Sequence, residues 1–119
     1  MPALRLHAGI SDNVARPYAD QLARQGVCSH YFNSSDPGLR LRLEGYQAAY
    51  WGENIGCRDG YATTREAVLT SHRVFQSERS ANGGHWKNIK NKTYRYVGIG
   101  IARSSGRTRL VTDFYTPPA

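Results

Sequence analysis

The sequence predicts an α+β fold, or an α/β/α layering around an antiparallel sheet. Three observations support this class: an apolar helical stripe near the amino end, a helix-capping box in the middle, and two β-rich runs near the carboxyl end. Helices therefore precede strands along the chain. No internal repeat, low-complexity tract or linker interrupts the 119 residues, so we expect one domain over residues 1–119.

The first helix is predicted over residues 11–26. Pro17 cannot donate a backbone hydrogen bond and its ring crowds the preceding turn, so the helix either kinks or begins there. Gly26 is a natural helix end. Apolar residues recur every four positions beside small alanines, as in a helix that packs closely, at Val14, Tyr18 and Leu22.

A second, shorter helix is predicted after a polar loop. Asp36 supplies an N-cap and Pro37 suits the first helical position, and Gly45 marks the end. The alternation of Leu39, Leu41 and Leu43 also fits a strand. We favour the helix because of its caps.

A third helix begins at a capping box. The Thr63 hydroxyl can accept from the backbone N–H of Glu66, whose carboxylate can reach back to the N–H of Thr63. This helix is expected to reach about Glu78. After a glycine turn, one turn of helix is predicted over Trp86–Ile89.

The runs YRYVGIGIA and TRLVTDFY, joined by a Ser-Ser-Gly turn, predict an antiparallel hairpin. We expect these to be central or near-central strands with helices on both faces. Gly98 and Gly100 alternate with larger apolar residues, which leaves one face open to close approach by a helix. The polar, glycine-flanked stretch WGENIGC is expected to be a loop.

Charge limits the classes of partner. The net charge is +7, from 16 Lys and Arg against 9 Asp and Glu, which favours anionic partners such as nucleic acid, anionic lipid or cell-wall polymer. The basic residues are scattered without a dense run, so we expect no specific nucleic-acid partner. No apolar run approaches the roughly 18 residues of a membrane helix, so we expect no transmembrane segment.

Side chains with potential chemistry fall in three short segments. GVCSHYF contains Cys28 and His30, WGENIGC contains Glu53 and Cys57, and GGHWKNI contains His85. The glycines before His85 permit a sharp turn that would aim this histidine. Two cysteines fit one disulfide or two free thiols, and the count does not decide between them.

The order of these motifs resembles a known family. A..YA..LA..G..SH, GY.....GENI, T..EAV......E, GGHW.NI and VGIGIA with a closing aromatic strand are similar to the CAP superfamily of cysteine-rich secretory, venom antigen 5 and plant pathogenesis-related proteins, especially its short bacterial secreted branch. The similarity extends from about Leu4 to Tyr115. It implies a three-layer α/β/α sandwich with a central antiparallel sheet.

The resemblance implies a cleft that gathers two histidines and two acidic residues: His30, Glu53, Glu78 and His85. Glu78, seven residues before His85, is the best match for the second acid. Neutral imidazoles of His30 and His85 would form a partial site for Zn²⁺, which water or a carboxylate would complete. A polar network that holds a loop conformation is the alternative interpretation.

The resemblance also suggests roles for three neighbouring residues. It pairs Cys28 with Cys57, because each lies within four residues of a cleft residue and because family members are mostly exported. It further implies that Trp86 anchors the His85 segment against the core.

The expected function is therefore that of an exported binding domain, secreted or periplasmic, with its leader peptide removed. Its ligand would be a lipid, sterol, glycan or other cell-envelope component, and the positive charge suits an anionic surface. No shared reaction follows from the fold. The alternative is a metal-assisted or general-base hydrolase that uses Glu53 and His85 on a peptide or cell-wall substrate. A third interpretation is a mainly structural or interaction domain of a longer envelope protein.

Overall fold

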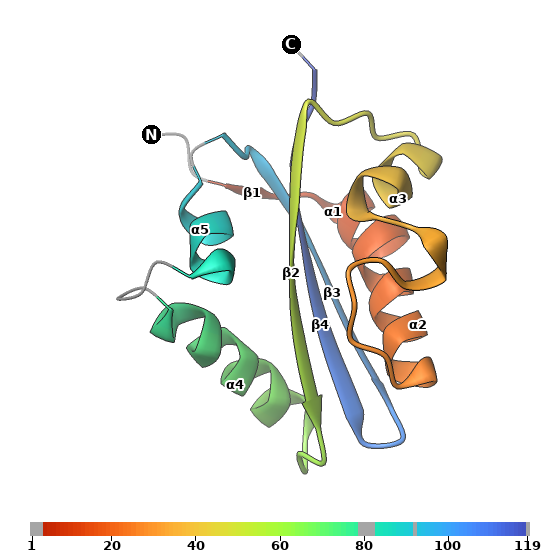
Figure 1. Ribbon diagram of the computed structural model, residues 1–119, viewed down its shortest axis with the longest axis vertical. Coiled ribbons are helices and arrows are strands. Elements are labelled where there is room, and N and C mark those ends of the chain that lie inside the picture. Colours follow the sequence, from red (N-terminus) through yellow and green to blue (C-terminus); the bar gives the residue numbers. More distant parts are fainter. Residues whose placement is uncertain (1–3, 79–82, 92, 119) are drawn as a thin grey trace.

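A computed structural model describes residues 4–78, 83–91 and 93–118, which form three layers (Figure 1). The middle layer is a four-stranded sheet in the order β1-β3-β4-β2. Its strands are β1 (Arg5–Leu6), β2 (Tyr50–Asp59), β3 (Tyr96–Ser104) and β4 (Arg107–Thr116). Three of them pair antiparallel, and the two-residue β1 adds a parallel edge that was not predicted.

Helices cover both faces of this sheet. One face carries α1 (Ala8–Ile10), α2 (Arg16–Gln25) and α3 (Pro37–Leu43), and the other carries α4 (Thr64–Ser77) and α5 (Gly84–Lys90) (Figure 1). The predicted α/β/α layering is confirmed, as is the central position of the hairpin strands β3 and β4. None of the helices in the described ranges has the length and apolar character needed to span a membrane.

Pro17 shapes the amino-terminal helix. A π-helical turn (Ser11–Ala15) joins α1 to α2, and Pro17 then lies in the first turn of α2. A wider turn at this point accommodates a residue that has no N–H to donate to the preceding turn. The helix therefore starts earlier than predicted, and it ends as predicted at Gly26, whose φ is 65°.

The N-caps predicted at Asp36 and Thr63 are confirmed. The Asp36 carboxylate accepts from the Leu39 amide at 2.8 Å, and α3 follows, so the strand alternative for this leucine-rich stretch is wrong. The Thr63 hydroxyl accepts from the Glu66 amide at 3.1 Å at the start of α4. The short helix after the glycine turn is present as α5, although the Trp86 side chain, expected to anchor it, lies outside the described part of the chain.

The expectation of a loop at WGENIGC is wrong. This stretch lies within the ten-residue strand β2, which pairs along its whole length with β4 and places Glu53 opposite Asp113. Glu53 and Asn54 are buried, and their polar groups bond to side chains from distant segments. The polar residues of this stretch therefore suggested an exposed loop, whereas the fold buries them against polar partners from other segments.

The helical layer contacts β3 directly at its glycines. A Cβ on Gly100 would lie 2.3 Å from the Ala15 carbonyl carbon, and one on Gly98 would lie 2.3 Å from the Ile10 side chain. This confirms the close approach expected from the glycine alternation. The buried core then forms between α2 and the sheet from Ala15, Tyr18, Ala19, Leu22, Ile55 and Val111.

A disulfide joins Cys28, in the loop after α2, to Cys57 on β2, with the two Cα atoms 6.2 Å apart. The pairing implied by the family resemblance is confirmed. The bond ties the loop that carries His30 to the strand that carries Glu53.

We predict that Gly100→Ala lowers the free energy of unfolding by about 1–3 kcal/mol, because the new methyl group would meet helix backbone that cannot move aside. Urea denaturation would measure the change. Gly84→Ala is the matched control, since a Cβ there meets nothing within 4 Å. Equal stability of the two variants would contradict the packing argument.

We predict that replacing both cysteines by serine lowers the free energy of unfolding by about 3 kcal/mol, because the bond closes a loop between positions 29 residues apart. Intact mass after alkylation without reduction should show no modified thiol in the native protein. Dithiothreitol should destabilise the native protein and leave the double variant unchanged. Two alkylated thiols in the unreduced protein would refute the pairing.

Candidate functional site

The four predicted cleft residues line one pocket of about 710 Å³. The loop after α2 supplies His30, β2 supplies Glu53, the end of α4 supplies Glu78, and the first turn of α5 supplies His85. Residues up to 55 positions apart in sequence therefore share one cavity. We call these four residues the polar cleft.

The Glu53 carboxylate is the centre of one half of the polar cleft. One oxygen lies 2.8 Å from His30 Nδ1, and the other accepts from Arg40 Nη2 at 2.7 Å. Arg40 Nη1 also donates to the His30 carbonyl at 3.0 Å and to Ser35 Oγ at 2.8 Å. The Glu53 side chain is 1% exposed, so both oxygens are committed to protein partners away from water.

The Tyr18 side chain of α2 packs against Arg40 in this half of the polar cleft. The Arg40 guanidinium carbon lies 3.4 Å from the centre of the Tyr18 ring, which is a cation–π contact. The Tyr18 hydroxyl donates to the Ser29 carbonyl and accepts from the Phe32 amide at 3.1 Å. Burial raises the pKa of Tyr18, so the phenol keeps the proton that it donates. The residues on either side of His30 are thereby bound to the core helix.

Glu78 forms the other half with His85. One Glu78 oxygen lies 2.6 Å from His85 Nδ1, and the other accepts the His85 backbone N–H at 3.0 Å. The imidazole stacks on Phe75 with ring centres 4.4 Å apart. A Cβ on Gly83 would lie 2.4 Å from the Glu78 carboxylate, so a glycine is needed where the chain turns. Glu78 thus lies beside His85 and lines the same pocket, and its role as the family's second acid stays a prediction.

Two asparagines connect α5 to β2. Asn88 Nδ2 donates to the Glu53 carbonyl at 3.1 Å and to Asn54 Oδ1 at 2.8 Å, and Asn54 Nδ2 donates to the His85 carbonyl at 3.0 Å. Sequence reasoning assigned neither residue, although each is the asparagine of a motif that carried the family resemblance, GENI or HWKNI. These bonds fix the spacing of the two histidine–carboxylate pairs.

The carboxylates determine which ring nitrogens remain available. A carboxylate accepts the Nδ1–H of a neutral imidazole, which leaves Nε2 with its lone pair. Neither Nε2 has a hydrogen-bond partner among the described residues. The described ranges contain no group of three or more His, Cys, Asp or Glu suited to a metal ion. A cation here would therefore take two imidazole ligands from the protein and its remaining ligands from water or a bound molecule.

Asp113 lies beneath the polar cleft, opposite Glu53 in the β2–β4 register, and is completely buried. Burial, and then the adjacent Glu53 carboxylate, raise the pKa of Asp113 well above its ordinary value. Burial would also raise the pKa of Glu53, but His30, Asp113 and Arg40 together lower it below its ordinary value. These opposite shifts favour the negative charge on Glu53 over one on Asp113, whose two buried carboxyl oxygens have no hydrogen-bond partner among the described residues.

The chain matches the family model described as the Cysteine-rich secretory protein family over residues 1–115. No curated protein sequence matches it significantly. The similar solved structures include an outer surface protein from Borrelia burgdorferi, with a TM-score of 0.76, 15% identity, and coverage of 98% of this chain and 79% of that one.

Two further structures share the fold. One is an extracellular protein containing an SCP domain from Bacillus anthracis, with a TM-score of 0.71 and 18% identity over 97% of this chain. The present chain spans 34% of that protein's length. The other is venom allergen-like protein 4 from Schistosoma mansoni, with a TM-score of 0.58, 16% identity, and coverage of 98% and 72%. The bacterial branch inferred from the motifs stays a prediction.

We predict that Asp113→Asn stabilises the protein increasingly as pH rises from about 4 toward 8. A carboxyl group whose folded pKa is raised contributes stability below its unfolded pKa of about 3.9, and that contribution is lost as pH rises through the folded pKa. Asparagine does not ionise, so the difference from the native protein should grow by up to about 1.4 kcal/mol per pH unit within that window.

Urea unfolding at several pH values would measure this difference. The exposed Asp12, replaced by asparagine, is the matched control and should show no such growth. A difference between Asp113→Asn and the native protein that is the same at pH 4 and pH 8 would contradict a neutral Asp113.

Proposed function

Because the chain belongs to the cysteine-rich secretory protein family, we propose that it is an exported binding domain whose polar cleft holds a zinc-type cation and a cell-envelope ligand. The main support for this proposal is the way in which the two cleft histidines are bonded. In each, Nδ1 is bound to a carboxylate, and Nε2 has no protein partner within the described ranges. Histidines that bind metals in proteins are oriented in this way.

Binding is better supported than hydrolysis. A general base needs a carboxylate or imidazole that can reach water or a nucleophile. Glu53 is enclosed, with both oxygens bound to His30 and Arg40. Both cysteines are in the disulfide, and no serine contacts either free Nε2 in the described residues. A hydrolase that uses Glu53 and His85 is therefore the weaker candidate.

The composition of the site supports zinc over a harder cation. Zinc accepts neutral imidazole nitrogen, whereas magnesium and calcium prefer several oxygen ligands. With two imidazoles from the protein, the ion would keep open coordination positions for groups of the bound envelope component. A bound Zn²⁺ would supply a positive charge and open coordination sites, and His30 and His85 would hold it.

Export and the class of ligand rest on separate observations. The disulfide favours an oxidising compartment. Two proteins with this fold are described as an extracellular protein and an outer surface protein. A net charge of +7, with Lys87 lining the same pocket, favours an anionic component of the envelope, such as a lipid or glycan, over a neutral ligand.

We predict that His30→Ala and His85→Ala each lower Zn²⁺ affinity at pH 7.5 at least tenfold, since each removes half of the protein ligands. Isothermal titration calorimetry would measure the affinity. Binding by the native protein should weaken in acidic solution, because a protonated imidazole has no lone pair to give to a cation.

His72→Ala is the matched control, because His72 is exposed on α4 and does not line the pocket. A native-like amide spectrum for each variant would show that the fold survives. If native protein and both cleft variants bind Zn²⁺ equally, or if none binds, the cation assignment is wrong. Turnover of a peptide or glycan substrate that requires Glu53 would favour the hydrolase instead.

A further inference from the structure

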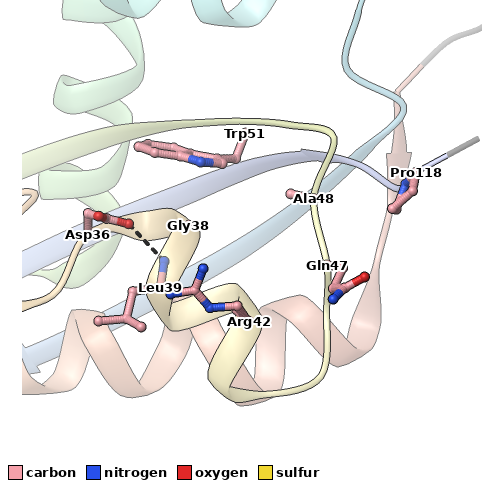
Figure 2. A pocket seen from close by; sticks show the side chains of 8 residues that line it. All are labelled: Asp36, Gly38, Leu39, Arg42, Gln47, Ala48, Trp51 and Pro118. Carbon is pink, nitrogen blue, oxygen red and sulfur yellow. Dashed lines mark hydrogen bonds between the residues drawn. The ribbon is translucent and has the colours of Figure 1, made fainter.

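A second groove lies between α3, the start of β2 and Pro118 near the carboxyl end (Figure 2). Its volume is about 380 Å³, and it shares no lining residue with the polar cleft. We propose that this groove, built around Trp51 and Arg42, binds a sugar ring that carries a carboxylate, as in an acidic polysaccharide.

Trp51 provides the flat surface of the groove. The residue is 41% exposed at the start of β2, and its indole lies over the first turn of α3 (Figure 2). A Cβ on Gly38 would lie 2.5 Å from the indole Nε1, so the glycine permits this contact and the helix backbone holds the ring in place. An indole that is fixed yet half-exposed offers an apolar face to the C–H side of a pyranose ring.

Arg42 and Gln47 provide hydrogen-bond donors beside that surface. Both line the groove, and neither side chain has a hydrogen-bond or ion-pair partner among the described residues. Arg40, two positions earlier on the same helix, by contrast donates through Nη1 to the His30 carbonyl and through Nη2 to Glu53. A free guanidinium binds a carboxylate through two parallel hydrogen bonds.

Asp36 provides an acceptor at the other end of the groove (Figure 2). One of its oxygens caps α3 by accepting from the Leu39 amide at 2.8 Å. The second oxygen has no hydrogen-bond partner in the described part of the chain, so it can accept from a hydroxyl group. The groove therefore combines an aromatic platform, a cation, an amide and a carboxylate, and a polyhydroxylated acid can use all four.

The same residues fit a nucleotide less well. A tryptophan can stack on a base and an arginine can bind a phosphate, but strands of nucleic acid are held by basic grooves that follow the backbone. Arg42 is the one cation among the described residues that line this groove, and an ionised phosphate has no hydrogen-bond donor to offer to the Asp36 carboxylate. Hydroxyl groups, in contrast, need such an acceptor.

The test uses a matched pair of probes, methyl β-D-glucuronide and methyl β-D-glucoside, which differ in the carboxylate, together with AMP. Each is titrated to about 10 mM into ¹⁵N-labelled protein while the Trp51 indole N–H and the backbone amides around Gly38 are followed by NMR. The expected result is a saturating shift of these signals with the glucuronide and a weaker response to the glucoside.

Variants separate the contributions. Arg42→Gln should weaken glucuronide binding about fivefold and leave the glucoside response unchanged. Trp51→Ala should abolish the response to both sugars. Arg65→Gln, an exposed arginine on α4 at the other face of the sheet, is the matched control and should bind as the native protein does. His30→Ala should also bind normally, which keeps this test independent of the polar cleft.

Three results would overturn the proposal. The first is no shift of the Trp51 indole signal with the glucuronide, and the second is an unchanged affinity in Arg42→Gln. The third is a stronger response to AMP than to the glucuronide, which would assign the groove to nucleotides.

Discussion

The burial of the Glu53 carboxylate is the constraint on which much of this structure depends. A charge removed from water is tolerated only with close compensation, because its desolvation costs several kcal/mol. Here the His30 ring and the Arg40 guanidinium each engage one oxygen, and the raised pKa of Asp113 favours its neutral form. Had Asp113 remained ionised, two negative charges would face each other across neighbouring strands with one arginine to balance them.

This constraint explains why so many segments meet at one point. Arg40 reaches Glu53 from α3, whose start is capped by Asp36, and the Tyr18 ring packs against the guanidinium from α2. The disulfide fixes the loop that carries His30, and Asn88 ties α5 to the backbone of Glu53. The polar cleft is thus held by bonds from several layers and does not depend on the order of any one loop.

Features that depend on neighbouring residues could be predicted from the sequence, and features that depend on distant partners could not. The caps at Asp36 and Thr63 act locally, so they correctly predicted where two helices begin. The glycine spacing of β3 is also local, and it correctly predicted the close approach of a helix. The polarity of WGENIGC was also judged locally and suggested a loop, because the residues that allow Glu53 to be buried lie on other elements. The order of the motifs predicted the four cleft residues. The role of Asp113 could not be predicted, because a single acid in a strand usually faces water.

The short helix α3 shows how one local sequence can serve two sites. In PGLRLRL the arginines are two positions apart, which places them about 200° around the helix axis, on nearly opposite sides. The intervening Leu41 is completely buried and anchors the helix to the core. Arg40 is consequently committed to the Glu53 network, while Arg42 projects into the groove beside Trp51. Both arginines carry the same charge and each is flanked by leucines, so their different roles follow from the side of the helix on which each lies. A change in the register of α3 by one residue would therefore disturb both the polar cleft and the groove.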